Sequence, residues 1–159
     1  MQREWDKLEG QEIRDIIKNS GIVGMGGATF PTHVKLSPNP DKKINTFILN
    51  AAECEPYLTA DYRMMLEYAE RIVIGVRIVM KTLGVSKGFV GIEDNKPQAV
   101  KAMKEAFKGT SVEVVALPTK YPQGAEKMLI KVLTGREVPQ GGLPMDVGVV
   151  VQNVGTSIS

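Results

Sequence analysis

Several short polar segments of this sequence carry groups that could hold a nucleotide, and the first is the glycine-rich run GMGGATFP at residues 24–31, with Lys35 shortly after it. Glycines let a backbone approach a ligand closely and turn successive N–H groups toward an anion, and lysine adds a charge suited to a phosphate. The alternative is a flexible loop that merely needs glycine at positive φ. The run follows a predicted helix and has neither a G-x-G-x-x-G fingerprint nor a Gly-Lys-Ser/Thr sequence, so it is not a Rossmann or Walker loop.

The second segment, NAAECEP at residues 50–56, directly follows a predicted strand. The amide of Asn50 offers donors and an acceptor that match the polar edge of a flavin ring. Glu53 and Glu55 supply two carboxylates, which we do not interpret as a coupled acid–base pair. One could bind ribose hydroxyls and the other a second ligand. The alternative is a polar loop with solvated glutamates.

The third and fourth segments are YPQGAE at residues 121–126 and QNVGT at residues 152–156, each after a predicted strand. The start of a helix presents free N–H groups and favours negative charge, so Glu126 could either contact a ligand or simply complement the helix dipole. Three of the four predicted strand ends therefore carry amide, hydroxyl or carboxylate groups. Together these segments indicate a ligand cradle.

Histidine and cysteine provide little indication of a catalytic or metal site in this sequence. His33 is the only histidine and Cys54 the only cysteine, which excludes a disulfide framework and a cysteine-built metal or cluster site within this chain. We therefore predict no metal ligands and assign no catalytic residue. The run Glu93-Asp94-Asn95 is expected to cap the helix that follows it.

Apolar periodicity and glycine stops predict the elements that position these segments. The predicted strands cover residues 44–49, 89–92, 112–117 and 147–151, and the predicted helices cover residues 11–19, 61–83, 98–107 and 124–133. This alternation predicts an α/β, Rossmann-like fold, with a mostly parallel sheet of about four strands covered by helices. Ligands in such sheets bind beyond the carboxyl ends of the strands, where the polar segments lie.

Composition bounds the class of protein. The 159 residues suffice for a single domain, and 43% hydrophobic with 24% charged residues is typical of a soluble globular protein. A net charge of +2 without a long basic run argues against nucleic acid binding. The sequence offers neither an apolar stretch long enough to span a membrane nor a signal peptide, so we expect a soluble cytoplasmic domain.

Taken in order, the four segments resemble the C subunit of Rnf-type membrane electron-transport complexes. More distantly they are similar to the NADH-binding flavoprotein subunit of respiratory complex I. The resemblance covers residues 22–156, and it implies a noncovalent FMN that takes a hydride from NADH and feeds electrons to 4Fe-4S clusters. For FMN it implies contacts from Gly24, Gly26, Gly27, Lys35, Asn50, Glu53, Gly124, Asn153 and Thr156. Toward NADH it implies Phe30, Glu55 and Glu126, with Phe30 stacking on the nucleotide.

The sequence departs from the complex I relatives at three positions. Met25 stands where they have arginine, Ala52 where they have an acidic residue, and Ala125 where they have the first glutamate of a Gly-Glu-Glu run. The cluster-bearing cysteines of the Rnf C subunits are absent, so we expect residues 1–159 to be one FMN- and NADH-binding domain of a longer subunit that carries the clusters elsewhere.

The resemblance implies a place on the cytoplasmic face of the membrane, peripheral through other Rnf subunits, with ferredoxin as an indirect partner. The isolated chain is expected to be only partially competent as an NADH-linked oxidoreductase. The alternatives are a nucleotide-binding module without redox chemistry and a subunit-assembly domain.

Overall fold

The computed structural model describes residues 4–25, 29–52, 60–119 and 126–159 and contains a four-stranded sheet in which every neighbouring pair is parallel. The strands are β1 (Thr46–Ala51), β2 (Lys87–Glu93), β3 (Val112–Leu117) and β4 (Val149–Asn153). Their spatial order is β3-β2-β1-β4. The predicted parallel α/β sheet is therefore confirmed.

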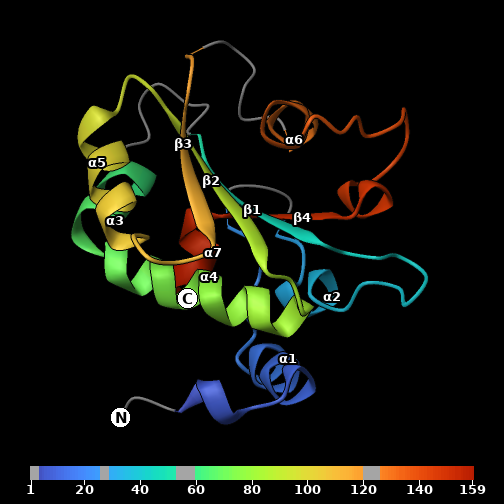
Figure 1. The fold of residues 1–159 in the computed structure, drawn as a ribbon. Helices are drawn as coiled ribbons and strands as arrows, with labels where there is room; N and C mark the ends of the chain where they lie inside the picture. The colour runs from blue at the N-terminus through green and yellow to red at the C-terminus, as the bar shows by residue number, and fades with distance from the viewer. Residues whose placement is uncertain (1–3, 26–28, 53–59, 120–125) are drawn as a thin grey trace.

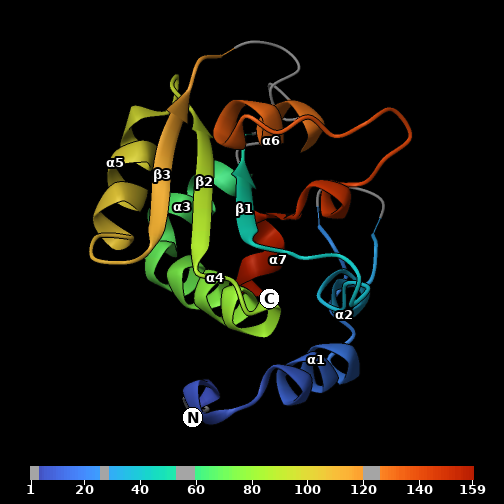
Figure 2. The same cartoon turned by 45° about the vertical axis from the view of Figure 1, so that its right-hand side comes forward.

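Helices cover both faces of the sheet (Figures 1 and 2). One layer packs on the face that Phe47, Leu49 and Val150 supply, and it is made of α1 (Gly10–Asn19), α2 (Thr32–Lys35), α3 (Ala60–Glu67), α4 (Ala69–Leu83), α5 (Pro97–Ala106) and α7 (Val154–Ile158). The opposite face, with Ile48 and Val151, is covered by α6 (Glu126–Thr134) and by the 3-10 turn η2 (Pro144–Val147). A further 3-10 turn, η1 (Trp5–Lys7), precedes α1.

The order of the strands creates a point where the chain changes direction. From β1 the chain moves outward to β2 and β3, then returns to place β4 on the other side of β1. The helices that follow β1 and β4, α3 and α7, pack on one face of the sheet, whereas α6, between β3 and β4, packs on the other. A crevice at the carboxyl ends of two such strands is where α/β sheets bind ligands.

The predicted helix over residues 61–83 is wrong, because the structure divides it into α3 and α4. Tyr68 separates them with φ −127° and ψ 28°. The buried Met65 and Ile72 lie on either side of the break at a spacing of seven residues, which is two helical turns. Apolar periodicity therefore continues across the break and could not indicate it.

The predicted end of this helical region is confirmed. Gly84 ends α4 with a left-handed φ of 68°, and its N–H bonds to the carbonyl of Lys81. That geometry is what a glycine after a helix provides. Pro97 begins α5, one residue before the predicted start.

The predicted strand over residues 147–151 is displaced, since β4 begins at Val149. Residues Pro144–Val147 form η2, and Gly148 follows with a left-handed φ of 76°. At its other end the strand extends to Asn153, two residues beyond the predicted end.

Among the described residues, none of the helices is long and apolar enough to cross a membrane. The same ranges contain no group of three histidine, cysteine or acidic side chains that could hold a metal ion.

Candidate nucleotide-binding site at the carboxyl edge of the sheet

Asn50 and Asn153 are direct partners across the parallel pair β1 and β4, at the point where the chain changes direction. Side chains alternate along a strand, and Ile48 and Val151, two residues earlier on each strand, pack against the α6 layer. Both asparagine side chains therefore lie on the α6 side of the sheet. Two residues from separate sequence motifs thus share one edge and one face.

The two amides differ in their surroundings. Asn50 is only 6% exposed, and its Oδ1 accepts a hydrogen bond of 3.1 Å from the N–H of Ala52. Asn153 is half-buried and precedes α7. Within the described part of the chain, its side chain makes no hydrogen bond to the start of that helix. The amide of Asn153 is thus the better placed of the two to bind a ligand directly.

Gln152 is a further candidate for a site residue. It lies within the fourth sequence segment, but the sequence analysis does not assign it a role. It points to the face opposite Asn153, because the two are adjacent in a strand. Its side chain is 3% exposed, and its Oε1 is buried without a hydrogen-bond partner among the described residues. Such atoms are rare in folded proteins and need an explanation such as a bound water or ligand.

The glycine-rich segment is held against the end of β4. The N–H of Met25 donates a hydrogen bond of 2.9 Å to Oγ1 of Thr156 on α7. The same segment folds back on itself, since the N–H of Gly24 bonds to the carbonyl of Phe30 at 2.8 Å and Val23 pairs with Pro31. The first and fourth predicted segments are therefore brought together.

The glycine-rich segment also carries strained backbone. Thr29 has a φ of 49°, which is a left-handed conformation. This conformation is energetically unfavourable for a residue with a β-branched side chain. Gly24, in contrast, does not have a positive φ, and a Cβ there would meet the carbonyl of Phe30 only at an ordinary 3.4 Å. A need for positive φ therefore does not explain why residue 24 is glycine. This result favours the other interpretation, in which the glycine lets a ligand approach the backbone closely.

Lys35 and Glu126 form an ion pair with 3.3 Å between Nζ and Oε1. Lys35 ends α2, whose layer covers one face of the sheet, and Glu126 begins α6, which covers the other. The pair therefore joins the two layers. Phe30 lies in the preceding segment with its side chain 52% exposed, and so is accessible to a stacking partner.

Five of the predicted site residues, Gly26, Gly27, Glu53, Glu55 and Gly124, lie outside the described residues. The predicted role of Asp94 in capping α5 is wrong. Lys96 holds the N-cap position, and Oδ1 of Asp94 instead accepts hydrogen bonds from the N–H and hydroxyl of Thr119, at 3.1 and 2.7 Å. Pro97 begins the helix, so Asp94 lies too far ahead of it to cap.

The described groups fit an FMN in their chemistry. Amides of Asn50 and Asn153 suit the donors and acceptors of a flavin ring, and the Lys35 ammonium suits a phosphate. The Oε1 of Gln152 is also buried without a hydrogen-bond partner among the described residues, but it lies on the opposite face of the sheet and is not part of this set. A noncovalent flavin held by polar groups is compatible with this set.

Two curated relatives support this interpretation. The chain is 71% identical over 157 residues to the C subunit of the proton-translocating ferredoxin:NAD(+) oxidoreductase complex of Clostridium ljungdahlii, with 99% of this chain and 34% of the relative covered. It is 56% identical over 153 residues to the C subunit of the Na(+)-translocating complex of Acetobacterium woodii, covering 96% of this chain and 34% of the relative. The chain thus spans about a third of the length of these relatives.

Solved structures agree on the fold. An NAD+-reducing [NiFe]-hydrogenase in the air-oxidized state superimposes with a TM-score of 0.78 at 26% identity, over 94% of this chain and 29% of that chain. The H2-reduced state gives a TM-score of 0.80 at 24% identity, over 97% of this chain and 31% of that chain, and there the likeness concerns the fold alone.

The family model described as the Nuo51 FMN-binding domain matches residues 17–159, which is nearly the whole chain. The match confirms the resemblance to flavoprotein subunits that the four sequence segments indicate. The chain belongs to the family of Nuo51 FMN-binding domains, and its sequence is similar to the C subunits of Rnf-type ferredoxin:NAD⁺ oxidoreductase complexes.

Proposed function

We propose that this domain binds FMN noncovalently at the carboxyl edge of the sheet and brings NADH against it. The observation that carries the proposal is the direct pairing of Asn50 with Asn153 at the point where the chain changes direction. The hydrogen bond between Met25 and Thr156 anchors the glycine-rich segment to α7, the helix that directly follows Asn153. A family defined by FMN binding supports the identity of the ligand.

Bound FMN would supply two-electron hydride acceptance from NADH and one-electron release to iron–sulfur clusters. The protein's task is to bind and orient. Lys35 neutralises the phosphate, and the amides of Asn50 and Asn153 orient the flavin ring. The hydroxyl of Thr156 holds the glycine-rich segment, with Gly24, in position through the N–H of Met25.

The nicotinamide nucleotide would bind on the side of Phe30 and Glu126. The exposed ring of Phe30 stacks on a nucleotide base, an interaction worth about 0.5–1.5 kcal/mol beyond the area it buries. Glu126 accepts hydrogen bonds from ribose hydroxyls. In the structure Glu126 is paired with Lys35. The two nucleotide sites therefore share a pair of neighbouring side chains.

The complete activity belongs to a larger assembly. The relatives named as ferredoxin:NAD(+) oxidoreductase subunits are about three times as long as this chain, which covers 34% of each. A cluster normally takes four cysteine ligands and this sequence has one. We propose that clusters elsewhere in the full-length protein pass electrons toward ferredoxin, in a complex on the cytoplasmic face of an ion-translocating membrane.

The test is a titration of the purified domain with FMN, followed by NADH under anaerobic conditions. Saturable quenching of flavin fluorescence and loss of the oxidised flavin absorbance on adding NADH are expected. Reduction of a small soluble dye should follow, and reduction of ferredoxin should be inefficient. Binding of FMN without bleaching would favour a nucleotide-binding module without redox chemistry. Failure to bind FMN or NADH would contradict the proposal and favour an assembly domain.

A further inference from the structure

The Lys35–Glu126 ion pair brings together the side chain proposed for the FMN phosphate and the side chain proposed for the NADH ribose. Nζ and Oε1 lie 3.3 Å apart although the residues are 91 positions apart in sequence. The side chains are 28% and 44% exposed, so the pair is partly accessible to solvent and to ligands. We propose that this pair exchanges partners when FMN binds: the phosphate takes Lys35, and Glu126 is released for the nicotinamide nucleotide.

The exchange follows from electrostatics. A phosphate that approaches Lys35 meets the Glu126 carboxylate 3.3 Å from the same ammonium. A phosphate and a carboxylate held by one ammonium repel each other, so either the carboxylate moves away or the phosphate binds less tightly. In both cases Glu126 opposes the binding of FMN. The inference rests on the proposed function, because it takes the FMN phosphate as the ligand of Lys35.

The ion pair with Lys35 should also affect how Glu126 binds the nicotinamide nucleotide. While Lys35 holds it, the Glu126 carboxylate has one acceptor oxygen engaged and its charge neutralised. Once a phosphate occupies Lys35, the carboxylate can accept hydrogen bonds from ribose hydroxyls. FMN binding should therefore raise the affinity for NAD⁺, and linkage requires NAD⁺ to raise the affinity for FMN by the same factor. The domain would bind its nucleotides preferentially in the order FMN, then NAD(H).

The size of the effect is bounded by the exposure of the pair. A solvent-accessible ion pair typically changes an equilibrium constant by about two- to fivefold. We accordingly expect Glu126→Gln, which keeps the shape and removes the charge, to tighten FMN binding by about two- to fivefold. Riboflavin, which lacks the phosphate, should bind equally well to the variant and to the unaltered chain.

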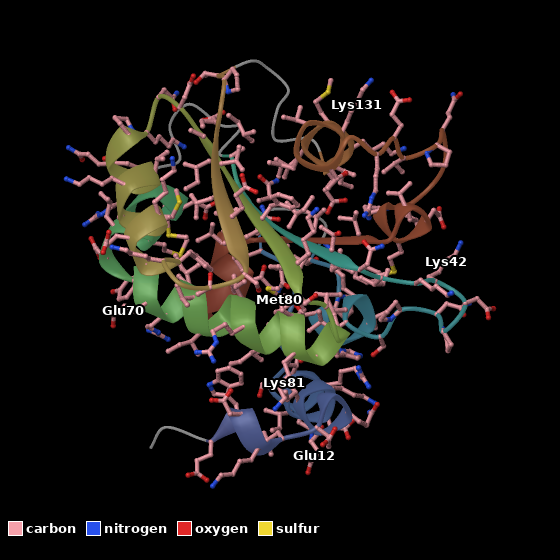
Figure 3. All side chains as sticks on the ribbon, viewed as in Figure 1. Glu12, Lys42, Glu70, Met80, Lys81 and Lys131 are labelled. Carbon is pink, nitrogen blue, oxygen red and sulfur yellow. The ribbon has the colours of Figure 1, made fainter. Side chains whose placement is uncertain are left out.

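Two further variants isolate the pair. In Lys35→Met the ammonium is gone, so adding Glu126→Gln to it should no longer tighten FMN binding. Glu137→Gln is the matched control, because Glu137 also pairs with a lysine at 2.5 Å, Lys131 on α6. Figure 3 shows Lys131 at the outside of the molecule. This control should leave the FMN affinity unchanged.

The decisive experiment measures FMN, riboflavin and NAD⁺ affinities by fluorescence quenching and calorimetry, with both nucleotides oxidised so that no chemistry intervenes. Two results together support the exchange. Glu126→Gln should tighten FMN binding, and this gain should disappear when Lys35→Met is also present. FMN should strengthen NAD⁺ binding only in variants that keep Glu126. If Glu126→Gln weakens FMN binding or leaves it unchanged, the pair positions Lys35 or is irrelevant, and the exchange is overturned while FMN binding stands. If the unaltered chain binds no FMN, both proposals fall.

Discussion

Asn50 on β1 and Asn153 on β4 face each other as register partners at the carboxyl edge of the sheet, 103 positions apart in sequence. The pairing exists because β4 returns beside β1 and not beside β3. The strands place both side chains on the α6 face, which makes one polar platform from two short motifs. The amides differ in burial, however, and that difference separates the effects of removing them.

Asn50→Ala should lower both FMN affinity and stability. The substitution removes the acceptor of the buried N–H of Ala52, which costs about 1–3 kcal/mol of unfolding free energy. Asn153→Ala removes no such bond and should change stability by less than about 0.5 kcal/mol while weakening FMN up to about tenfold. Urea unfolding and FMN titration of both variants give the comparison. Equal destabilisation by the two changes would contradict it.

Thr156→Val should release the glycine-rich segment from α7. Valine keeps the volume but removes the hydroxyl that accepts the N–H of Met25 at 2.9 Å. We expect FMN affinity to fall about fivefold, which corresponds to about 1 kcal/mol. Hydrogen exchange of the Met25 amide should accelerate in the same variant. Thr156→Ser, which keeps the hydroxyl, should preserve both properties, and a loss in Thr156→Ser as large as in Thr156→Val would assign the effect to packing.

Lys35→Ala should weaken FMN binding more than riboflavin binding, because the proposed partner of the ammonium is the phosphate. A charge-assisted hydrogen bond of this kind is worth about 1.5–3 kcal/mol, which is about ten- to a hundredfold in the FMN dissociation constant. Parallel fluorescence titrations with the two flavins make the measurement. Equal losses for both would place Lys35 away from the phosphate.

The order and type of most elements can be predicted because apolar periodicity and glycine stops are local signals. The strand Val112–Leu117 has the same bounds in the prediction and in the structure. The break at Tyr68 escapes prediction because the spacing of Met65 and Ile72 hides it. Gln152 escapes it because the predicted strand stops before that residue, so its alternation with Asn153 and its burial are not visible in the sequence.

The relationships within the site could not be predicted, because they depend on strand order. No local pattern states that β4 lies beside β1, and hence that Asn50 meets Asn153. The same holds for the ion pair of Lys35 with Glu126 and for the hydrogen bond between Met25 and Thr156, whose partners are 91 and 131 positions apart. The sequence predicts that the four segments share one edge of the sheet, but it could not predict the contacts between them.

Acidification should lower the free energy of unfolding through a carboxylate in the segment around η2. The ammonium of Lys42, 2.7 Å from Asp146, and the N–H of Leu143 lower the pKa of the Asp146 carboxyl below its ordinary value. The folded state thus has the lower pKa, so the stabilisation is present above pH ~4 and is lost as the pH falls through the folded value. Asp146→Asn should flatten this part of the pH dependence of the urea midpoint. Lys42→Met should reproduce part of the flattening, since the bond from Leu143 remains.

Gly75→Ala tests whether the position of α7 matters to the site. A Cβ on Gly75 of α4 would lie 1.7 Å from the carbonyl oxygen of Ser157, so the helices could not keep their separation. Overpacking of this kind costs about 1–3 kcal/mol of stability. Since Thr156 precedes the displaced residue, FMN affinity should fall as well in the protein that remains folded.

Glu70→Ala is the control on the same helix. Its side chain is exposed at the outer surface of α4 (Figure 3), so stability should change by less than about 0.5 kcal/mol and FMN binding should not change. Urea unfolding with and without FMN separates the two effects for each variant. If Gly75→Ala lowers stability but leaves FMN affinity intact, α7 supports the fold without positioning the glycine-rich segment, and the proposed role of Thr156 would have to be abandoned.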